Sequence, residues 1–402
     1  SRRQDDRYLF LEALLSARQR LHISYCGQSP KDNRPRPPSV LVSELLDAIE
    51  AGFGPRVRED LCTHHRLQAF DPAYFSGDPK LYSYSTENLR GAARAAAPRR
   101  EPGAFIPSGL PEPGAGLTEI DVETFCAFFA HPARFLLRRR LGLYLRDREA
   151  AIPEEEPFTL EGLDAYGLGQ DLVARLLADR DIAQAYPVLK AAGRLPHGAP
   201  GAYAYDRLHD AMTGLAADIG RAVSGGRIEA VPVDLRLAGV HLTGALDPLY
   251  PEGLVRYRPA DVKARDRLDA WIRHLILNHP GCAAPVRETR FIGRDRGVRY
   301  APLAGAEQPL ADLVTLFLAG LRTPLHFFPE SSLAYADATA AGKDAAAALR
   351  AARAKWEAFR YPEKDDPDNE LCFDRIDPLD DAFRRLAETV FHPLLAAEEA
   401  LT

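Results

Sequence analysis

Cysteine pairs and long apolar runs are missing from this 402-residue chain. Its five cysteines (Cys26, Cys62, Cys126, Cys282 and Cys372) lie far apart, with no Cys-x-x-Cys pair and no histidine at zinc-finger spacing. This spacing argues against a disulfide framework, structural zinc and an iron–sulfur cluster, and it predicts reduced thiols in a cytoplasmic protein. No apolar run approaches the length that spans a bilayer. The opening SRRQDDRYLF has neither an initiator methionine nor a secretion signal, which is typical of a piece of a longer chain.

An excess of positive charge is also missing. The formal net charge of −6 leaves no whole-chain basic surface for nucleic acid, so any DNA contact must come from a local groove. Only seven of the 51 basic residues are lysine. Arginine suits bidentate contacts to phosphate, although a GC-rich genome gives the same bias. With 46% hydrophobic and 27% charged residues, the composition is that of an ordinary soluble globular protein.

The length allows two domains, and composition predicts the boundary between them. Residues 89–117 are rich in glycine, proline, alanine and arginine without sustained periodicity, which indicates a linker. Residues 1–88 before it combine helical patterns with a short strand ending at Tyr25, and Ser39 is placed to cap a helix. Residues 118–402 after it form the second predicted domain.

The second domain mixes helix and strand patterns, which predicts an α/β or α+β fold. Residues 228–263 alternate apolar and polar side chains around turn residues, as in an antiparallel meander. A break near His131-Pro132 divides two helical segments, because the residue before a proline disfavours helix. Further helices are predicted over 158–192, 203–223, 266–278, 310–321 and 336–359 and after Asp380, with a hairpin over 286–300.

The stretch RYRPADVKARD, residues 256–266, contains Asp261 and Lys263 in an Asp-x-Lys pattern. In metal-dependent nucleases such a carboxylate lies at a strand end and binds Mg²⁺ together with a second carboxylate from the neighbouring strand. The lysine lies on the same strand face and orients the attacking water. Asp247 can supply the second carboxylate, and His209 on the preceding predicted helix can supply a further ligand. The residues leave two interpretations open, a magnesium site and a solvated strand-end pair.

Two other patterns suit nucleic-acid contacts. Three consecutive arginines in FLLRRRLG fan around a predicted helix, so at most two can face one groove. Two alternate tyrosines in KLYSYS can stack on bases. A solvated helix face and a packed strand are the respective alternatives. These DNA-binding candidates are Arg138, Arg139, Arg140, Tyr82 and Tyr84.

Several segments together resemble known families. DDRYLFLEALLSARQRLHISYCG is similar to the final conserved segment of UvrD-like superfamily 1 helicases, but Leu15-Ser16-Ala17-Arg18 stands where that family has Thr-Arg-Ala. The longer set, in order, resembles the C-terminal third of the RecC family, the exodeoxyribonuclease V gamma subunits. Its members here are PPSVLVSELLDAI, HRLQAFDPAYF, FFAHPARFLLRRRLGLYL, GLVRYRPADVKARDRLDAWIRHL, GLRTPLHFFPESS and VFHPLL.

The RecC resemblance implies a fold and a role. Residues 1–88 would be the end of a degenerate helicase-like domain. Residues 118–402 would be a restriction-endonuclease-like core of the PD-(D/E)xK type, with large helical additions and a lost catalytic site. The partners would be the RecB and RecD subunits, DNA double-strand ends and single-stranded DNA in the bacterial cytoplasm. Mg²⁺ and ATP would be used by those partner subunits and no cofactor by this chain. Trp271 stands where active relatives have glutamine, which suggests a filled pocket.

Three functions follow as hypotheses. The first is a non-catalytic DNA-binding and scaffolding part of a RecBCD helicase-nuclease, acting in double-strand-break repair and homologous recombination. The second is an active Mg²⁺-dependent deoxyribonuclease that uses Asp247, Asp261 and Lys263. The third is a subunit-docking module that makes no DNA contact.

Overall fold

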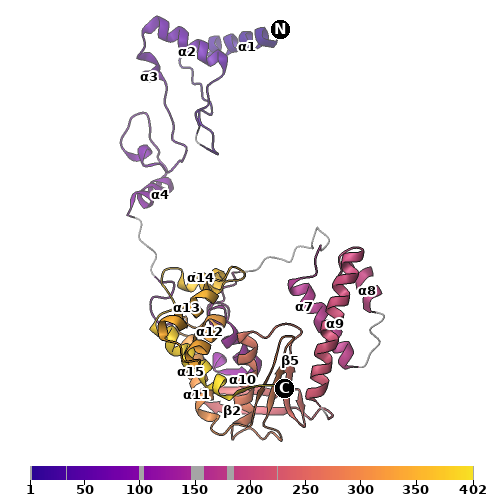
Figure 1. Ribbon diagram of the computed structural model, residues 1–402. Coiled ribbons are helices and arrows are strands. Elements are labelled where there is room, and N and C mark those ends of the chain that lie inside the picture. Colours follow the sequence, from indigo (N-terminus) through magenta and orange to yellow (C-terminus); the bar gives the residue numbers. More distant parts are fainter. Residues whose placement is uncertain are drawn as a thin grey trace. The chain divides into compact units, whose positions relative to one another are not determined.

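The computed structural model describes residues 2–32, 34–98, 104–145, 158–178, 185–223 and 225–401 (Figure 1). Residues 99–103 of the predicted linker lie outside these ranges. The chain divides into two compact units, an N-terminal unit, Ser1–Glu101, and a C-terminal unit, Pro102–Thr402. Among the described residues, no helix has both the length and the apolar character that crossing a bilayer would need.

The N-terminal unit is helical and loosely packed. Ser39 caps α2, as predicted, by accepting a hydrogen bond from the backbone N–H of Val42. The strand predicted to end at Tyr25 is absent, because the chain there makes only an isolated bridge between Gln28 and Pro35. The helices are α1 (Arg2–Ser16), α2 (Val40–Phe53), α3 (Val57–Leu61) and α4 (Thr86–Ala96), with a 3-10 turn η1 (Pro72–Phe75).

Helix α4 corrects the linker prediction. It covers the first residues of the segment 89–117, which were expected to be irregular. Ser85 caps it through a hydrogen bond from the Asn88 N–H, and the alanines and arginines that follow are good helix formers. A composition typical of linkers can therefore still form a helix when a cap precedes it.

The C-terminal unit contains two small sheets surrounded by helices. Its strands are β1 (Glu119–Asp121), β2 (Val231–Leu237), β3 (Val240–Leu246), β4 (Leu249–Tyr250), β5 (Gly253–Tyr257), β6 (Thr289–Ile292), β7 (Gly297–Tyr300) and β8 (Glu398–Ala400). Its α-helices are α5 (Val122–Ala130), α6 (Pro132–Phe135), α7 (Gly162–Leu177), α8 (Ala185–Ala191), α9 (Ala199–Ala222), α10 (Ala264–Asn278), α11 (Glu307–Gly320), α12 (Pro329–Ala340), α13 (Ala345–Trp356), α14 (Pro367–Phe373) and α15 (Asp381–Ala397). Shorter turns are η2 (Ala115–Leu117), the π-helical η3 (Leu136–Arg140) and η4 (Glu363–Asp365).

Strand pairing confirms the predicted hairpins but not a continuous meander. β2 pairs with β3 and β4 with β5, both antiparallel, yet β3 and β4 belong to different sheets. The three-stranded sheet has the order β1-β3-β2, and the five-stranded sheet has the order β4-β5-β6-β7-β8. The chain passes from one sheet to the other at Asp247-Pro248, where a cis peptide bond lies. The β6–β7 hairpin was predicted correctly.

The five-stranded sheet is buried on both faces. Leu254 and Phe291 pack into the core around α10, whereas their neighbours Val255 and Ile292 pack into the core formed by α7, α8 and α9. Successive side chains of a strand point to opposite faces, so these pairs assign one helical layer to each face. β5 and β6 are parallel and joined through α10, as a β-α-β crossover requires. Figure 1 shows α7 and α9 beside β5.

Candidate functional site

The end of β5 carries the candidate site, but Asp261 and Lys263 do not lie on the strand. β5 ends at Tyr257, and Asp261 lies in the loop that leads to α10. The backbone N–H of Arg258 makes the last ladder bond, to the Ile292 carbonyl at 2.9 Å, and Pro259 has no N–H to continue it. The expectation that Asp261 and Lys263 share a strand face was therefore wrong.

Asp261 is held by the β6–β7 turn. Its Oδ1 accepts hydrogen bonds from Arg294 Nε at 3.0 Å and Nη2 at 2.8 Å, with both side chains at least half exposed. Gly293 permits this approach, since a Cβ built there would lie 2.3 Å from Cγ2 of Val262. The Asp261 carboxylate therefore already has a cationic partner at the surface.

Asp247 also pairs with an arginine. Both of its carboxylate oxygens accept hydrogen bonds from the guanidinium of Arg227. No hydrogen bond or ion pair joins Asp247 to Asp261 or Lys263 among the described residues. Metal binding by the two carboxylates stays a prediction.

Lys263 and His209 have separate surroundings. Lys263 precedes α10 directly, and its backbone N–H donates to Asp266 at 2.9 Å while its side chain is exposed. His209 lies on α9, where its ring contacts Tyr205 and its Nδ1 lies 3.5 Å from the carboxylate of Asp210. The described contacts of His209 thus stay within its own helix.

Arginines occupy the strand end itself. Arg256 and Arg258 are two residues apart, so their side chains share one face of the strand. Arg256 Nε lies 2.9 Å from Asp269, and Arg258 Nη1 binds both oxygens of Asp266 at 2.7 and 2.8 Å. Two arginines at this strand end are thus paired with the aspartates of α10. The sequence showed these arginines, but their register on β5 could not be read from it.

Helix α10 behind this strand end is almost wholly buried, and its buried polar side chains have hydrogen-bond or ion-pair partners. Arg273 is 0% exposed and binds Glu123 at 2.5 Å and Asp269 at 3.1 Å. Trp271 is 1% exposed, with its ring centroid 5.7 Å from that of His274 and 5.5 Å from that of Tyr300. Trp271 therefore fills the space behind the strand with aromatic packing.

A polar cluster that sequence reasoning missed joins α6 to α14. Arg134 donates from Nε to Asp368 and from Nη2 to Asp366, each at 2.7 Å, and His131 Nε2 lies 3.0 Å from Asp366. Burial alone would raise the pKa of Asp366, but the hydrogen bond from His131 and the charge of Arg134 hold it well below its usual range. The residues lie more than 230 positions apart, so no local pattern could have revealed the cluster.

This cluster is also the one group of histidine and acidic side chains with metal-binding spacing among the described residues. His131 Nδ1 accepts a hydrogen bond from the Arg134 N–H at 3.2 Å, so the ring proton lies on Nε2, which faces Asp366. A metal on Nε2 would require that proton to move to Nδ1 and break the cap of α6. Arg134 already supplies the positive charge, and the cluster acts as an ionic clasp.

The basic and aromatic DNA-binding candidates differ in how free their side chains are to contact DNA. Arg140 donates to the carbonyls of Pro111 and Glu112, so it holds the chain's own segment. Arg138 lies over the ring of Tyr144 at 5.5 Å, and Arg139 is exposed. In the N-terminal unit, Tyr82 is 61% and Tyr84 92% exposed, with ring centroids 5.6 Å apart. The two tyrosines lie in irregular chain rather than in the packed strand that was the alternative.

Comparison with known proteins identifies a family that matches this chain. The family model described as the RecC C-terminal domain matches residues 117–340. The RecBCD enzyme subunit RecC of Escherichia coli (strain K12) is 36% identical over 351 residues, which cover 83% of this chain and 30% of that protein. The RecBCD enzyme subunit RecC of Haemophilus influenzae is 33% identical over 68% of this chain and 25% of its own length.

A more distant relative extends the match. The RecBCD enzyme subunit RecC of Mycobacterium tuberculosis is 29% identical over 90% of this chain and 34% of that protein. The chain thus spans about a third of the length of the curated relatives it matches. With the family model covering more than half of the chain, the conclusion is that the chain belongs to the RecC family and contains its C-terminal domain.

Proposed function

We propose that this chain is a non-catalytic, DNA-binding and scaffolding part of a RecBCD enzyme that helps to split duplex ends and to channel single strands. The relatives carry the name RecBCD enzyme subunit RecC, so the proposed partners are RecB and RecD subunits, which would supply the ATP- and Mg²⁺-dependent chemistry. The proposed place of action is double-strand-break repair in the bacterial cytoplasm.

The observation that carries the non-catalytic part is the arginine pair at the end of β5. A guanidinium cannot bind Mg²⁺, and Arg256 and Arg258 are each neutralised by an aspartate of α10. A functional two-carboxylate site would have to form from Asp247 and Asp261, which both pair with surface arginines. These pairings support a scaffold over a nuclease.

The order of elements supports a restriction-endonuclease-like core as the finer fold proposal. A helix (α9), an antiparallel hairpin (β2–β3), a further strand (β5), a helix (α10) and a strand parallel to β5 (β6) follow one another in the chain. We place this core in residues 118–402, after the helicase-like remnant at 1–88 and the linker at 89–117. Asp247 and the end of β5 fall where such a core would carry its site.

The DNA-binding part of the proposal depends on exposed side chains. Tyr82 and Tyr84 present two ring faces near one another, which suits stacking of single-stranded bases. Arg139, with Arg138 beside Tyr144, offers charge for phosphate contacts. Arg140 contributes less, because its guanidinium already binds backbone carbonyls.

The test is fluorescence anisotropy of the chain with single-stranded and forked DNA at several salt concentrations. We expect binding that weakens steeply with salt, and a loss of about 1–3 kcal/mol per tyrosine in Tyr82→Ala and Tyr84→Ala. Tyr203→Ala, an exposed tyrosine on α9, is the matched control. Absence of DNA binding at low salt would favour the docking module instead.

Calorimetric titration with Mn²⁺, followed by a cleavage assay, tests the nuclease alternative. We expect neither binding nor cleavage that differs between the chain and Asp261→Ala. Metal binding lost in that variant, together with Mg²⁺-dependent cleavage, would contradict the proposal.

A further inference from the structure

A pocket of about 430 Å³ lies beside the ionic clasp. Three segments form it: the α5–α6 junction, the start of α12, and residues 361–369 leading into α14. Its volume falls within the range of about 300–1,000 Å³ that is usual for binding pockets. The clasp joins two of the three segments through the Arg134–Asp366 ion pair and the contact of His131 with Asp366.

Proline and phenylalanine give this pocket firm apolar walls. Pro132, Pro329 and Pro362 all line it, and their rings fix the local backbone. Phe327 and Phe328 also line it and are almost fully buried. The walls offer apolar contact, so an occupant needs an apolar portion.

The polar part of the lining consists of carboxylates with His131 and Asn369, and Asp365 has no cationic partner among the described contacts. The oxygens of Glu363 accept hydrogen bonds from the N–H of Glu330, at 3.0 Å, and from the N–H and hydroxyl of Ser331, at 2.9 and 2.6 Å. Asp366 is engaged by the clasp. Asp365 is exposed and lines the same pocket. Acidic lining of this kind repels phosphate and attracts a cation.

An exposed aromatic side chain lines the pocket. Tyr361 is 95% exposed, and Phe359, two residues earlier in the chain and outside the lining, is 99% exposed. The backbone of Tyr361 has φ 54, a left-handed conformation that a bulky residue rarely adopts. A guanidinium stacks well on an aromatic face.

From these contacts we infer that the pocket binds an arginine side chain, with an apolar neighbour, on a segment of a protein partner. The guanidinium would lie between the ring of Tyr361 and the carboxylate of Asp365, and the apolar neighbour would contact the proline walls. The inference deepens the proposed function, because the partner would be a subunit of the same assembly. DNA is disfavoured as the occupant by the acidic lining.

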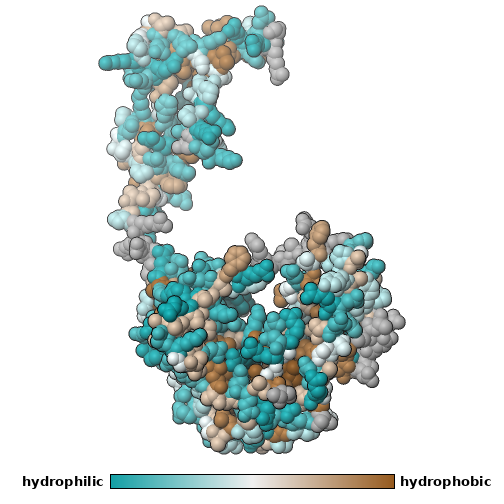
Figure 2. All heavy atoms as spheres, in the orientation of Figure 1, coloured by the Kyte–Doolittle hydropathy of each residue, from teal (hydrophilic) through white to brown (hydrophobic). Residues whose placement is uncertain are grey.

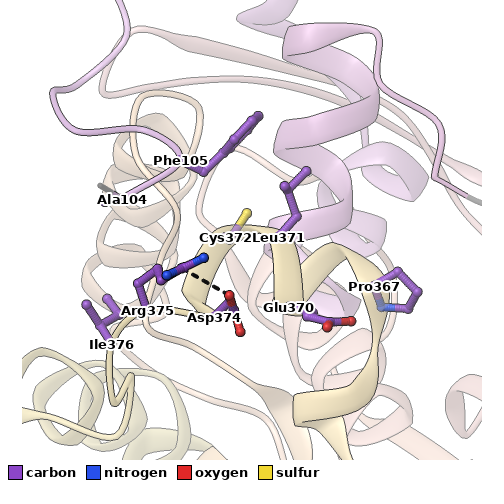
Figure 3. A pocket seen from close by; sticks show the side chains of 9 residues that line it. All are labelled: Ala104, Phe105, Pro367, Glu370, Leu371, Cys372, Asp374, Arg375 and Ile376. Atoms are coloured by element: carbon purple, nitrogen blue, oxygen red, sulfur yellow. Dashed lines mark ion pairs between the residues drawn. The ribbon is translucent and has the colours of Figure 1, made fainter. Parts of the chain in front are cut away.

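A second pocket of similar size shows what the first one has in addition. It holds about 420 Å³ and is lined by α14 and the residues that follow it (Figure 3). Phe105 and Ala104, from the segment before β1, line its other side, and Arg375 pairs with Asp374 at 3.2 Å. In that pocket Asp374 is paired with an arginine, and Glu370 is a further exposed carboxylate. In the first pocket, Asp365 has no such arginine partner among the described contacts, and Tyr361 adds an exposed ring.

Photo-crosslinking in the assembled complex tests the inference. Phe359→benzoylphenylalanine would be placed in the full-length protein, purified with its RecB and RecD partners and irradiated with and without DNA. We expect crosslinks to a partner segment that contains an arginine, with a yield about tenfold lower when Asp365→Asn is added. Asp374→Asn, in the second pocket, is the matched control and should leave the yield unchanged.

Other results would overturn the inference. Crosslinks to DNA, crosslinks within the chain, a yield that ignores Asp365→Asn, or no crosslink in an intact complex would each exclude an arginine-bearing partner segment. Failure to copurify with the partners at all would contradict the proposed function instead, so the two failures are distinguishable.

Discussion

The N-terminal and C-terminal units differ sharply in what they bury. Among the described residues before position 99, Ala92 alone is buried, and α1 and α2 leave side chains such as Leu15 and Phe53 more than three-quarters exposed. The C-terminal unit has three clusters of buried apolar residues and a central helix, α10, that is buried nearly all round. Figure 2 shows hydrophobic residues among the hydrophilic ones on the surface of the N-terminal unit.

The difference predicts where the stability of the chain originates. Apolar burial is the main favourable term in folding, and a unit with one buried residue gains little from it. We therefore expect the C-terminal unit to determine the cooperative unfolding transition. Equivalent substitutions in the two units should have very different costs.

Removal of the central aromatic should have the largest effect. Trp271→Ala leaves a cavity between His274 and Tyr300 and should lower the free energy of unfolding by about 3–5 kcal/mol. Phe53→Ala, at an exposed position in the N-terminal unit, should change it by less than about 0.5 kcal/mol. Urea unfolding followed by circular dichroism measures both, and equal losses would break the comparison.

Loss of the buried ion pair between Arg267 and Glu398 of β8 should have the next largest effect on the free energy of unfolding. Glu398 accepts two hydrogen bonds from Arg267, both at 2.8 Å, and one from the Tyr300 hydroxyl. Glu398→Ala leaves the buried Arg267 charge with Asp337, 3.9 Å away, as its counter-charge and should cost about 3–4 kcal/mol. Glu399→Ala, at the exposed neighbouring position, should cost under about 1 kcal/mol. The same urea unfolding assay measures both variants. Equal losses for the two glutamates would show that the pair with Arg267 is no more stabilising than the exposed pair of Glu399.

Acid should weaken the C-terminal unit through His274. Burial lowers the pKa of His274 to about 4, below the 6.5 of an ordinary histidine. Between these values the unfolded chain binds a proton that the folded chain does not, so stability should fall as pH drops from 6.5 to 4, by at most about 3 kcal/mol. Unfolding measured across this range should show a shallower slope in His274→Gln. An unchanged slope of stability against pH in this variant would show that other groups cause the pH dependence.

The smallest effect should come from a surface ion pair in the N-terminal unit. Arg7 and Glu44 lie 2.8 Å apart, with both side chains at least half exposed. A double-mutant cycle with Arg7→Ala and Glu44→Ala should give a coupling energy below about 0.5 kcal/mol. A coupling of several kcal/mol would show that this unit is held together by charge rather than by burial.

Local patterns in the sequence were sufficient for many elements. The alternation in residues 228–263 predicted the β2–β3 and β4–β5 hairpins, and the turn residues near 294 predicted the β6–β7 hairpin. Pro132 marked the end of α5. The helix predicted over 336–359 is instead two helices, α12 and α13, because Gly342 takes φ 78 and Asp344 caps the next helix. That glycine-then-aspartate signal was present in the sequence and could have been used.

The candidate site depended on register and on distant contacts, which local patterns do not encode. Asp261 and Lys263 matched a motif by spacing alone, while Pro259 ended β5 before them. The partners of Arg134 lie beyond position 365, and only the folded chain brings them together. The sequence therefore indicated which residue types the site contains, but it did not indicate which of these residues contact one another.

The arginines at the end of β5 also constrain how this protein can change. Arg256→Asp alone would put a carboxylate beside Asp269, and Arg258→Glu alone would do the same beside Asp266. Each single replacement places two like charges together in a partly buried position, which destabilises the fold. The first mutation toward a metal-binding strand end would therefore lower the stability at either position. Only simultaneous replacement of the arginine on the strand and the aspartate on the helix avoids that penalty. The two charge pairs therefore hinder the stepwise evolution of a metal-binding site at this strand end.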